Sequence, residues 1–533
     1  MSDHDKTPRT SSAGTRTRLP LGALSGLLAG GAALAVAESA AAAVRPQAGP
    51  VVAVGGAAID RTPTAVKDWA IRTFGSDDKL VLQLGILAVL TLFALALGAL
   101  AVRHRRTGAG GVLAFGVVGA AAALGRPDST GVTDVLPSVL GAIAGAVLLY
   151  VLAGLLPAPH RTEPGERGEG WDRRRFVLAA TAAAAASAGA GVLGRALSGA
   201  GGREAVASRE NVTLPPPGSP APAVPRRARA GVEGVSRFIT PNGDFYRVDT
   251  ALVVPKVDAT GWRLRVHGDG VARERTLTFD DLLRRELIER DITLTCVSNE
   301  VGGPYVGNAR WIGVRLADLL DECGVRPPSK GGPADQLVAR SVDGMTIGSP
   351  VEEVMDGRDA MLAVGMNGQP LPFAHGFPVR MLVPGLYGYV SACKWIEDIE
   401  LTTFDAYDAY WVERDWAREA PVKTQSRIDT PKPFARPKAG TVMVAGVAWA
   451  QHRGIDRVEI RVDDGPWQEA TLAAEDSRDT WRQWSYAWQA TRGGHHLTVR
   501  ATDRTGEVQT EKRTRTVPDG ASGRHSVVVT VDG

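Results

Sequence analysis

The pattern of apolar and polar residues divides the chain into two unlike parts. Up to about residue 200 the sequence is dominated by Ala, Gly, Leu and Val, whereas most of the Trp, Tyr and acidic residues lie beyond it. The first part contains about five apolar stretches that approach the roughly 20 residues needed to cross a bilayer. These stretches cover residues 19–44, 80–102, 110–124, 135–156 and 176–193. The pattern therefore predicts an all-α membrane domain over residues 1–200 and a water-soluble part after it.

Arginine clusters at the ends of these stretches predict the orientation of the membrane domain. They precede the first stretch, follow the second, and separate the fourth from the fifth (Arg9, Arg16, Arg18; Arg103, Arg105, Arg106; Arg161, Arg167, Arg173, Arg174, Arg175). Because basic residues mark cytoplasmic ends, the amino terminus is expected inside and everything after Gly194 outside. Cleavage of the first stretch as a signal peptide, near residues 41–43, would leave this later orientation unchanged.

The residues directly before the fifth stretch have two interpretations. Asp172, Arg173, Arg174, Arg175 and Phe176 precede a weakly hydrophobic, Ala-rich segment. This arrangement resembles a twin-arginine signal placed inside the chain, which exports domains that are already folded. The same arginines would also serve as a simple cytoplasmic anchor for the fifth span.

The soluble part is expected to contain a linker and two domains. Residues 201–234 lack apolar periodicity and include a Pro-rich segment, which is typical of an extended tether. Residues 235–432 mix strand-like runs such as 262–266 with helix-like runs such as 279–288, so this region is predicted to be α+β.

Residues 433–533 are predicted to form an immunoglobulin-like β-sandwich. Residues 458–467 and 497–506 alternate apolar and polar side chains at period two and run into turn residues. Trp481, Trp484 and Trp488 are expected as core and edge aromatics around a strand rather than on a helix.

Composition and charge exclude several classes of function. Lys and Arg number 61 against 58 Asp and Glu, giving a formal charge of +3, and no basic run with interleaved aromatics occurs in the soluble part. Nucleic acid is therefore not an expected partner. The three cysteines form no C-x-x-C pair, which argues against a disulfide scaffold, a four-cysteine zinc site and covalently attached haem. The membrane domain is interpreted as an anchor or a docking surface.

The sharpest local signal is a cysteine at the end of an apolar run. Cys296 follows a strand-like segment and precedes small polar residues and the pair Gly302 and Gly303. Such a loop lets backbone approach a cofactor closely. Taken alone, a single cysteine in an apolar strand is more often a buried small hydrophobic residue.

Residues 293–303 resemble the segment that carries the molybdenum-ligating cysteine in the sulfite oxidase family of molybdopterin enzymes. Further segments resemble that family's motifs in the required order (residues 244–247, 308–316, 375–380, 383–388 and 391–395). The region after residue 433 is similar to the family's dimerisation domain. The resemblance covers roughly residues 235–509 and implies a sulfite-oxidase-type molybdopterin domain between the membrane domain and the β-sandwich.

The resemblance implies roles for eight residues around a molybdenum-molybdopterin cofactor. Cys296 is the implied metal ligand, and Arg380 and Lys394 are the implied phosphate ligands. The other cofactor-binding residues are implied to be Tyr246, Arg247, His375 and Ser391, and the implied catalytic residues are Cys296, Arg247 and Trp416. Cys323 is interpreted as structural, and Cys393 has no assigned metal role.

Two departures from the family's sulfite-oxidising pattern affect the expected substrate. In place of an Arg-Asn-His run, the chain has Arg247, Val248 and Asp249, which displaces the anion-binding arginine and introduces an acid. In place of an Arg-Asp-Tyr motif, it has Arg414, Asp415 and Trp416. A phenol can donate a hydrogen bond from its hydroxyl group. An indole ring can donate one only from its N–H, which lies at a different position on the side chain. Both departures count against sulfite oxidation.

The resemblance implies oxygen-atom transfer at a molybdenum centre that ends up outside the cytoplasm. Its implied partners are a small oxyanion or sulfoxide-type substrate, a separate electron carrier, the membrane, and a second copy bound through the C-terminal domain. A cofactor inserted in the cytoplasm favours the twin-arginine interpretation. Two alternatives stay open: a reductase of sulfoxides such as oxidised methionine, and a non-catalytic surface protein on a degenerate scaffold.

Overall fold

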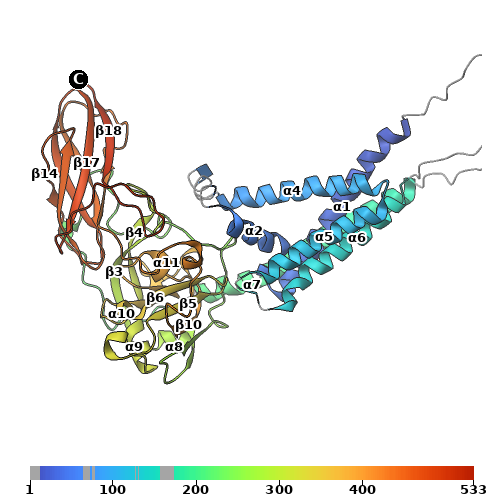
Figure 1. The fold of residues 1–533 in the computed structure, drawn as a ribbon, viewed down its shortest axis with the longest axis horizontal. Helices are drawn as coiled ribbons and strands as arrows, with labels where there is room; N and C mark the ends of the chain where they lie inside the picture. Colours follow the sequence, from blue (N-terminus) through green and yellow to red (C-terminus); the bar gives the residue numbers. More distant parts are fainter. Residues whose placement is uncertain are drawn as a thin grey trace, which may run out of the picture. The chain divides into compact units, whose positions relative to one another are not determined.

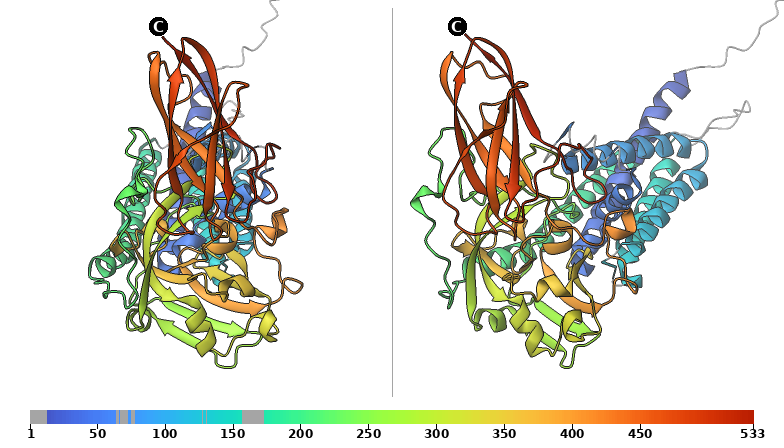
Figure 2. Two further views of the ribbon diagram at one scale, coloured as in Figure 1. Left: turned by 90° about the vertical axis from the view of Figure 1, so that its left-hand side faces the viewer. Right: turned by 60° about the vertical axis from the view of Figure 1, so that its left-hand side comes forward.

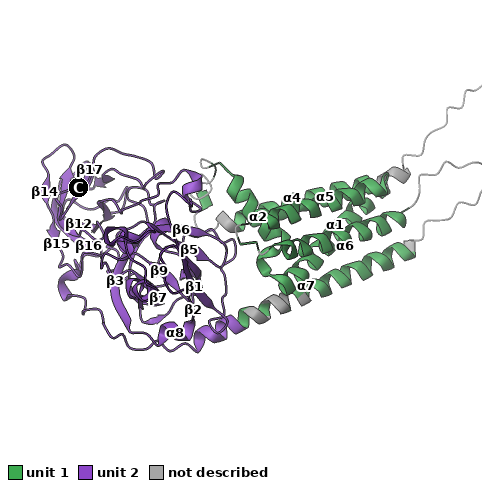
Figure 3. Ribbon diagram, turned by 60° about the horizontal axis from the view of Figure 1, so that its bottom comes forward, with its two compact units in different colours: residues 1–203 green, residues 204–533 purple. Residues whose placement is uncertain are grey.

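The computed structural model describes residues 13–63, 66, 73–74, 78–126, 128–129, 131–156 and 173–533. Asp172, which the predicted export signal includes, lies outside these residues. The chain divides into two compact units, Met1–Arg203 and Glu204–Gly533, which Figure 3 shows in different colours.

The first unit is helical in every predicted apolar stretch. Its helices are α1 (Ala13–Val44), α2 (Pro50–Arg61), α4 (Asp78–Ala101), α5 (Arg105–Leu124), α6 (Leu136–Gly154) and α7 (Arg173–Glu210), the last of which continues into the second unit. Among the described residues, five helical segments are long and apolar enough to cross a membrane: Arg18–Val44, Leu80–Ala101, Arg105–Leu124, Val132–Gly154 and Arg174–Val192. The crossing itself and its orientation stay predictions.

Small residues allow the helices of this unit to pack closely. Helix α6 runs beside α1 and beside α5 (Figure 1). A Cβ on Gly145 of α6 would lie 2.8 Å from the Ala33 Cβ and 3.0 Å from the Ala29 carbonyl oxygen, so only glycine fits this contact with α1. Such contacts between small residues are typical of helices that associate in a bilayer.

The central part of the second unit contains two sheets. One has the order β3-β4-β7-β8 with β9 paired to β7, and the other has the order β2-β1-β10-β5-β6. The strands and short helices of this part are β1 (Arg263–Gly268), β2 (Arg275–Thr278), α8 (Phe279–Leu283), β3 (Leu287–Thr295), β4 (Val306–Arg315), α9 (Leu316–Glu322), β5 (Gln336–Ser341), β6 (Thr346–Pro350), α10 (Val351–Val354), β7 (Met361–Met366), β8 (Gln369–Pro370), β9 (Arg380–Leu382), α11 (Gly388–Ser391) and β10 (Ile396–Thr402).

The predicted helix over residues 279–288 is wrong in its second half. Helix α8 ends at Leu283, and Leu287 and Ile288 begin strand β3, where they lie opposite Val314 and Gly313 of β4. Leu287 and Ile288 are both buried in the core of the central part. Pairing with a distant strand therefore overrides the local helical pattern.

The C-terminal part of this unit consists of two four-stranded sheets, β11-β12-β16-β15 and β14-β13-β17-β18. Figure 2 shows their strands in orange and red as an elongated β structure. The strands are β11 (Gln425–Thr430), β12 (Gly440–Trp449), β13 (Ile455–Val462), β14 (Gln468–Glu469), β15 (Thr471–Leu472), β16 (Arg482–Ala490), β17 (Gly493–Asp503) and β18 (His525–Val531). The two strands predicted from period-two alternation are confirmed as β13 and β17.

The three tryptophans are confirmed as buried residues in and beside a strand. Trp484 and Trp488 lie in β16 and belong to the core of the two C-terminal sheets. Trp481, directly before β16, belongs instead to the core of the central part, as does Trp449 of β12. The C-terminal sheets therefore share an apolar interface with the sheets that carry the candidate site.

Candidate functional site

Cys296 lies immediately after strand β3, as predicted. Its backbone N–H donates to the Tyr305 carbonyl oxygen at 2.9 Å, and its own carbonyl accepts from Asn299 N–H at 3.0 Å, which turns the chain. The side chain is buried, and this burial raises the pKa of the thiol. The thiol is therefore protonated at neutral pH unless a metal ion holds it as the thiolate.

The C-terminal sheets cover strand β3 next to Cys296. The Thr293 N–H donates to the Asp479 carbonyl oxygen at 2.9 Å, and the Thr293 hydroxyl accepts from Trp481 N–H at 2.7 Å. The Gln451 amide donates to the Thr293 carbonyl oxygen at 2.8 Å and to the Thr295 hydroxyl at 3.0 Å. These hydrogen bonds hold the end of strand β3, directly before the thiol, in place. Their partners lie more than 150 residues further along the sequence.

The loop after Cys296 is held by the same C-terminal region. Gly302 has a φ of 81°, and a Cβ there would collide with the ring of His525 on β18. The Arg427 guanidinium donates to the Gly303 carbonyl oxygen at 2.7 Å. Glycine is required at Gly302 for its positive φ and for the close contact of its backbone with the His525 ring.

Arg380 is a buried cation without a counter-ion among the described residues. It begins strand β9, is 5% exposed, and lies with its guanidinium carbon 5.5 Å from the centre of the Trp311 ring. No carboxylate in the described part of the chain lies at ion-pair distance, its Nε has no hydrogen-bond partner, and burial lowers its pKa. Uncompensated buried charge is costly, so this position is suited to a bound anion.

His375 lies beside Arg380 and is held as the neutral ring. Its Nε2 lies 3.0 Å from the Asn242 carbonyl oxygen, whereas its Nδ1 is buried without a hydrogen-bond partner. Burial and the positive charge of Arg380 lower the pKa of His375 to about 4. A Cβ on Gly376, whose φ is 111°, would lie 3.1 Å from Lys394 Cα and 3.2 Å from Arg380 Cβ, so this glycine lets the three segments meet.

Stability is expected to depend on pH through two buried histidines. Burial lowers the pKa of both His375 and His525 to about 4. Since unfolding restores a pKa of about 6.5, their contribution is complete above pH 6.5 and is lost as the pH falls toward 4. Urea unfolding of the cofactor-free protein should show a free energy that falls by up to about 1.4 kcal/mol per pH unit for each histidine. A pH dependence that His375→Asn and His525→Asn leave unchanged would contradict this assignment.

Lys394 forms an ion pair with Asp249. Its Nζ lies 3.0 Å from Asp249 Oδ2, and both side chains are less than 10% exposed. The Arg247 Nε lies 3.6 Å from the same oxygen, and the Arg247 side chain is 40% exposed. The sequence identified Asp249 as a departure from the family pattern but not as the partner of the predicted phosphate lysine.

The remaining predicted residues surround this group less directly. The Tyr246 ring stacks on Phe245 at 5.1 Å, and burial and the neighbouring Cys296 raise the pKa of its phenol. The Ser391 hydroxyl in α11 donates to the backbone carbonyls of residues 386 and 387. Trp416 packs against Tyr389 of the same helix, with ring centres 5.5 Å apart.

Six predicted residues lie close enough to influence one another electrostatically. Burial raises the pKa of Cys296 and of Tyr246, and the charges of Lys394 and Arg380 respectively oppose part of that rise. Burial lowers the pKa of His375, and the charges of Arg380, Lys394 and Arg247 lower it further. The fold therefore brings together Cys296, Tyr246, Arg247, His375, Arg380 and Lys394. The two remaining predicted residues are associated with helix α11: Ser391 lies in it, and Trp416 packs against its Tyr389.

The residues present fit a pterin that carries a phosphate. Arg380 offers an uncompensated charge and an unused Nε, and His375 offers an unused ring nitrogen. A phosphate dianion and a ring system with many donors and acceptors would satisfy both. Sequence reasoning missed Asn242, which orients His375, and Asp343, whose carboxylate accepts a hydrogen bond from Thr250 at 3.3 Å.

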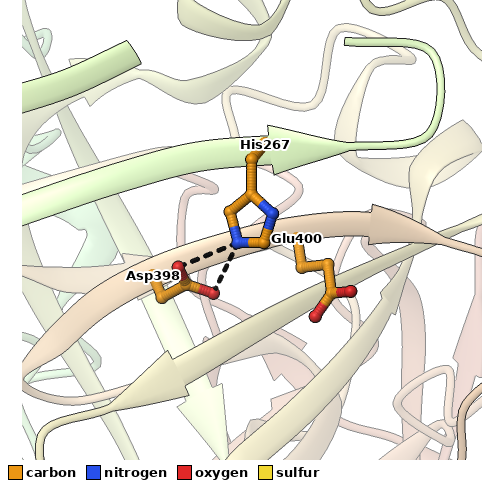
Figure 4. Close-up of side chains that lie close together, drawn as sticks. All are labelled: His267, Asp398 and Glu400. Carbon is orange, nitrogen blue, oxygen red and sulfur yellow. Dashed lines mark hydrogen bonds and ion pairs between the residues drawn. The ribbon is translucent and has the colours of Figure 1, made fainter. Parts of the chain in front are cut away.

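A second group with metal-ligand chemistry lies on the other central sheet. His267 of β1 is opposite Glu400 of β10, and its Nε2 lies 3.0 and 3.2 Å from the two carboxylate oxygens of Asp398 (Figure 4). The three side chains, with Trp262 and Arg340, line a hollow of about 810 Å³. The sequence did not predict this group, and an ordinary histidine–carboxylate pair accounts for its contacts.

Comparisons with known proteins match the central part of the chain to a family of molybdopterin-binding oxidoreductases. The family model described as "Oxidoreductase molybdopterin binding domain" matches residues 251–411. Mitochondrial sulfite oxidase of Rattus norvegicus is 31% identical over 288 residues, which are 46% of this chain and 52% of that protein. The human mitochondrial enzyme is 30% identical over 303 residues, which are 49% of this chain and 55% of that protein. The chain thus spans about half the length of these relatives.

Two further proteins are similar to parts of this chain. NADH nitrate reductase 1 of Oryza sativa subsp. japonica is 34% identical over 201 residues, which are 33% of this chain and 21% of that protein. The structure of the sulfane dehydrogenase SoxCD from Paracoccus pantotrophus covers 57% of this chain and 85% of its own, with 24% identity and a TM-score of 0.47.

The region that carries the site belongs to the sulfite oxidase family of molybdopterin-dependent oxidoreductases. Its cofactor is accordingly molybdenum bound to molybdopterin.

Proposed function

We propose that this chain is a membrane-tethered oxidoreductase that carries out oxygen-atom transfer at an extracytoplasmic molybdenum centre. The bound cofactor supplies the two-electron oxygen-atom chemistry, and the protein supplies binding, orientation and electrostatics. Two features carry the proposal: the buried thiol of Cys296, and the buried guanidinium of Arg380, for which the described residues provide no carboxylate at ion-pair distance. Both residues influence the pKa of Tyr246, which lies in the same group. A degenerate scaffold would have no use for this costly charge.

Each residue of the site has a defined part in this proposal. Cys296 holds the metal as the thiolate, and Arg380 binds the phosphate with help from Lys394. The neutral ring of His375 contacts the pterin through its free nitrogen. Burial keeps the phenol of Tyr246 protonated at neutral pH, so it serves as a hydrogen-bond donor. Trp416, held by Tyr389, supplies an indole N–H where relatives of the sulfite-oxidising pattern have a phenol.

The surroundings of the site suggest how it is placed and supplied with electrons. The five apolar helices in the described part of the chain support a membrane anchor, and with the amino terminus inside, an odd number of spans would leave the site outside the cytoplasm. A separate electron carrier is proposed to complete the reaction. The two C-terminal sheets are proposed to form an immunoglobulin-like domain through which two copies associate.

Export of the folded site is expected to require the arginines at the start of α7. Replacing Arg173, Arg174 and Arg175 together with lysine keeps the charge but removes the guanidinium groups that a twin-arginine signal needs. The soluble unit should then stay on the cytoplasmic side, as measured by protease accessibility in spheroplasts. Unimpaired export would mean that these arginines are only a cytoplasmic anchor.

Turnover assays on the molybdenum-loaded protein test the reaction. Methionine sulfoxide with a reduced dye probes oxygen removal, and sulfite with an oxidised dye probes oxygen addition. Turnover of either probe that Cys296→Ala abolishes would support the proposal. Absence of bound molybdenum and of turnover in the folded protein would instead favour a non-catalytic surface protein.

A further inference from the structure

Asp249 places a negative charge at the one partly exposed cation of the site. Its side chain is 4% exposed, and its Oδ2 lies 3.0 Å from Lys394 Nζ and 3.6 Å from Arg247 Nε. Arg247 is 40% exposed, whereas Lys394 is 8% and Arg380 is 5% exposed. An anion arriving from solvent would therefore meet Arg247 first, and would meet it together with the Asp249 carboxylate.

The charges of this group leave no cation for a second anion. Arg247, Lys394 and Arg380 carry three positive charges, and the cofactor's phosphate, close to a dianion, neutralises about two of them. Asp249 neutralises the third. Its charge also reaches Arg380, where it raises the pKa against the effect of burial. A carboxylate with such low exposure repels a neighbouring oxyanion more strongly than it would in water.

From this arrangement we infer that Asp249 is a specificity-determining residue that excludes oxyanions and selects an uncharged substrate. The inference rests on the proposed function and narrows its substrate class. An uncharged molecule with a polar S–O bond, or its reduced thioether form, carries no net charge for Asp249 to repel. A sulfite-type anion would have to approach the carboxylate without a free cation to compensate.

A second carboxylate, that of Asp343, adds negative charge near Asp249. Thr250, next in sequence to Asp249, donates a hydrogen bond to the Asp343 carboxylate at 3.3 Å. Burial raises the pKa of Cys393, which immediately precedes Lys394, and the negative charge of Asp343 raises it further. A second acid on this side of the site adds to the barrier against an incoming anion.

The test uses sulfate as an inert oxyanion and the full-length, cofactor-loaded protein. Sulfate affinity is measured from the rise in unfolding temperature and the change in tryptophan fluorescence, with ionic strength held constant by sodium chloride. Asp249→Asn keeps the size of the side chain but removes its charge, and should bind sulfate at least about tenfold more tightly than the wild type. Asp318→Asn, an equal charge change at a residue 60% exposed on α9, should behave as the wild type.

Two results of the binding experiment would overturn the inference. One is equal sulfate affinity in the wild type and Asp249→Asn. The other is saturable sulfate binding by the wild type that Arg247→Gln abolishes, which needs no variant of Asp249 to fold. The molybdenum content of each protein is measured in parallel, because loss of metal in Asp249→Asn would make Asp249 a cofactor-binding residue instead. A wild type without molybdenum would contradict the proposed function, whereas equal sulfate affinities contradict only the role of Asp249.

Discussion

Replacing Cys296 with alanine is expected to reduce bound molybdenum by at least about tenfold while the protein stays folded. Cys296 is the one cysteine placed at a strand end beside a glycine loop, within reach of the charge of Lys394 and close to the Tyr246 phenol. Its thiol is buried and protonated without metal, so the thiolate–metal bond is the main interaction that the substitution removes. Metal analysis of the purified protein gives the ratio directly.

Two matched variants separate loss of a metal ligand from loss of packing. Cys323→Ala removes a fully buried thiol at the end of α9, and should keep the molybdenum content of the wild type. His267→Ala removes the histidine of the group on the other central sheet and should do the same. Full retention of molybdenum by Cys296→Ala, or equal loss in all three variants, would contradict the assignment of Cys296.

Replacing Arg380 with methionine is expected to have opposite effects on stability and on cofactor binding. In the protein without cofactor, Arg380 is a buried charge with no carboxylate at ion-pair distance in the described residues. The Trp311 ring, a 3.5 Å hydrogen bond to the His375 carbonyl oxygen and the more distant charge of Asp249 offset its burial only in part. Removing it should raise the free energy of unfolding of the cofactor-free protein by about 1–3 kcal/mol. The same change removes the main phosphate ligand, so molybdenum and pterin content should fall at least about tenfold.

The control for this prediction is an arginine that already has its counter-ion. The Arg285 guanidinium donates two hydrogen bonds to the Glu322 carboxylate, at 2.7 and 2.8 Å. Arg285→Met should leave cofactor content unchanged and should not stabilise the protein. If Arg380→Met lowers the stability of the cofactor-free protein as much as an ordinary core substitution, Arg380 is a structural residue and not an anion ligand.

Local sequence patterns predicted much of the secondary structure, because apolar periodicity is set by which face of an element is buried. The five apolar stretches are helices, and the alternating runs are strands β13 and β17. The pattern failed at residues 284–288, where Leu287 and Ile288 are buried by pairing with β4 and not by a helix. Such pairing depends on residues far away in the chain, which local periodicity does not contain.

In the candidate site too, residues within short motifs could be predicted from the sequence, whereas contacts between distant segments could not. Cys296, His375, Arg380 and Lys394 could be predicted because each lies in a short motif of recognisable order. The pairing of Asp249 with Lys394, across 145 residues, could not be read from either motif. The hydrogen bonds of Gln451 to strand β3 were missed for the same reason. These contacts, which adjust charge and backbone position around the motifs, appear only when the chain is folded.

The central claim is that the fold around Cys296 and Arg380 holds a molybdenum cofactor. The most direct measurement is the molybdenum-to-protein ratio of the full-length chain, purified from a host that makes molybdopterin. We predict a ratio near one, with pterin released in equal amount on denaturation. A ratio near zero for protein that is folded, from cells in which other molybdopterin proteins are loaded, would contradict the claim.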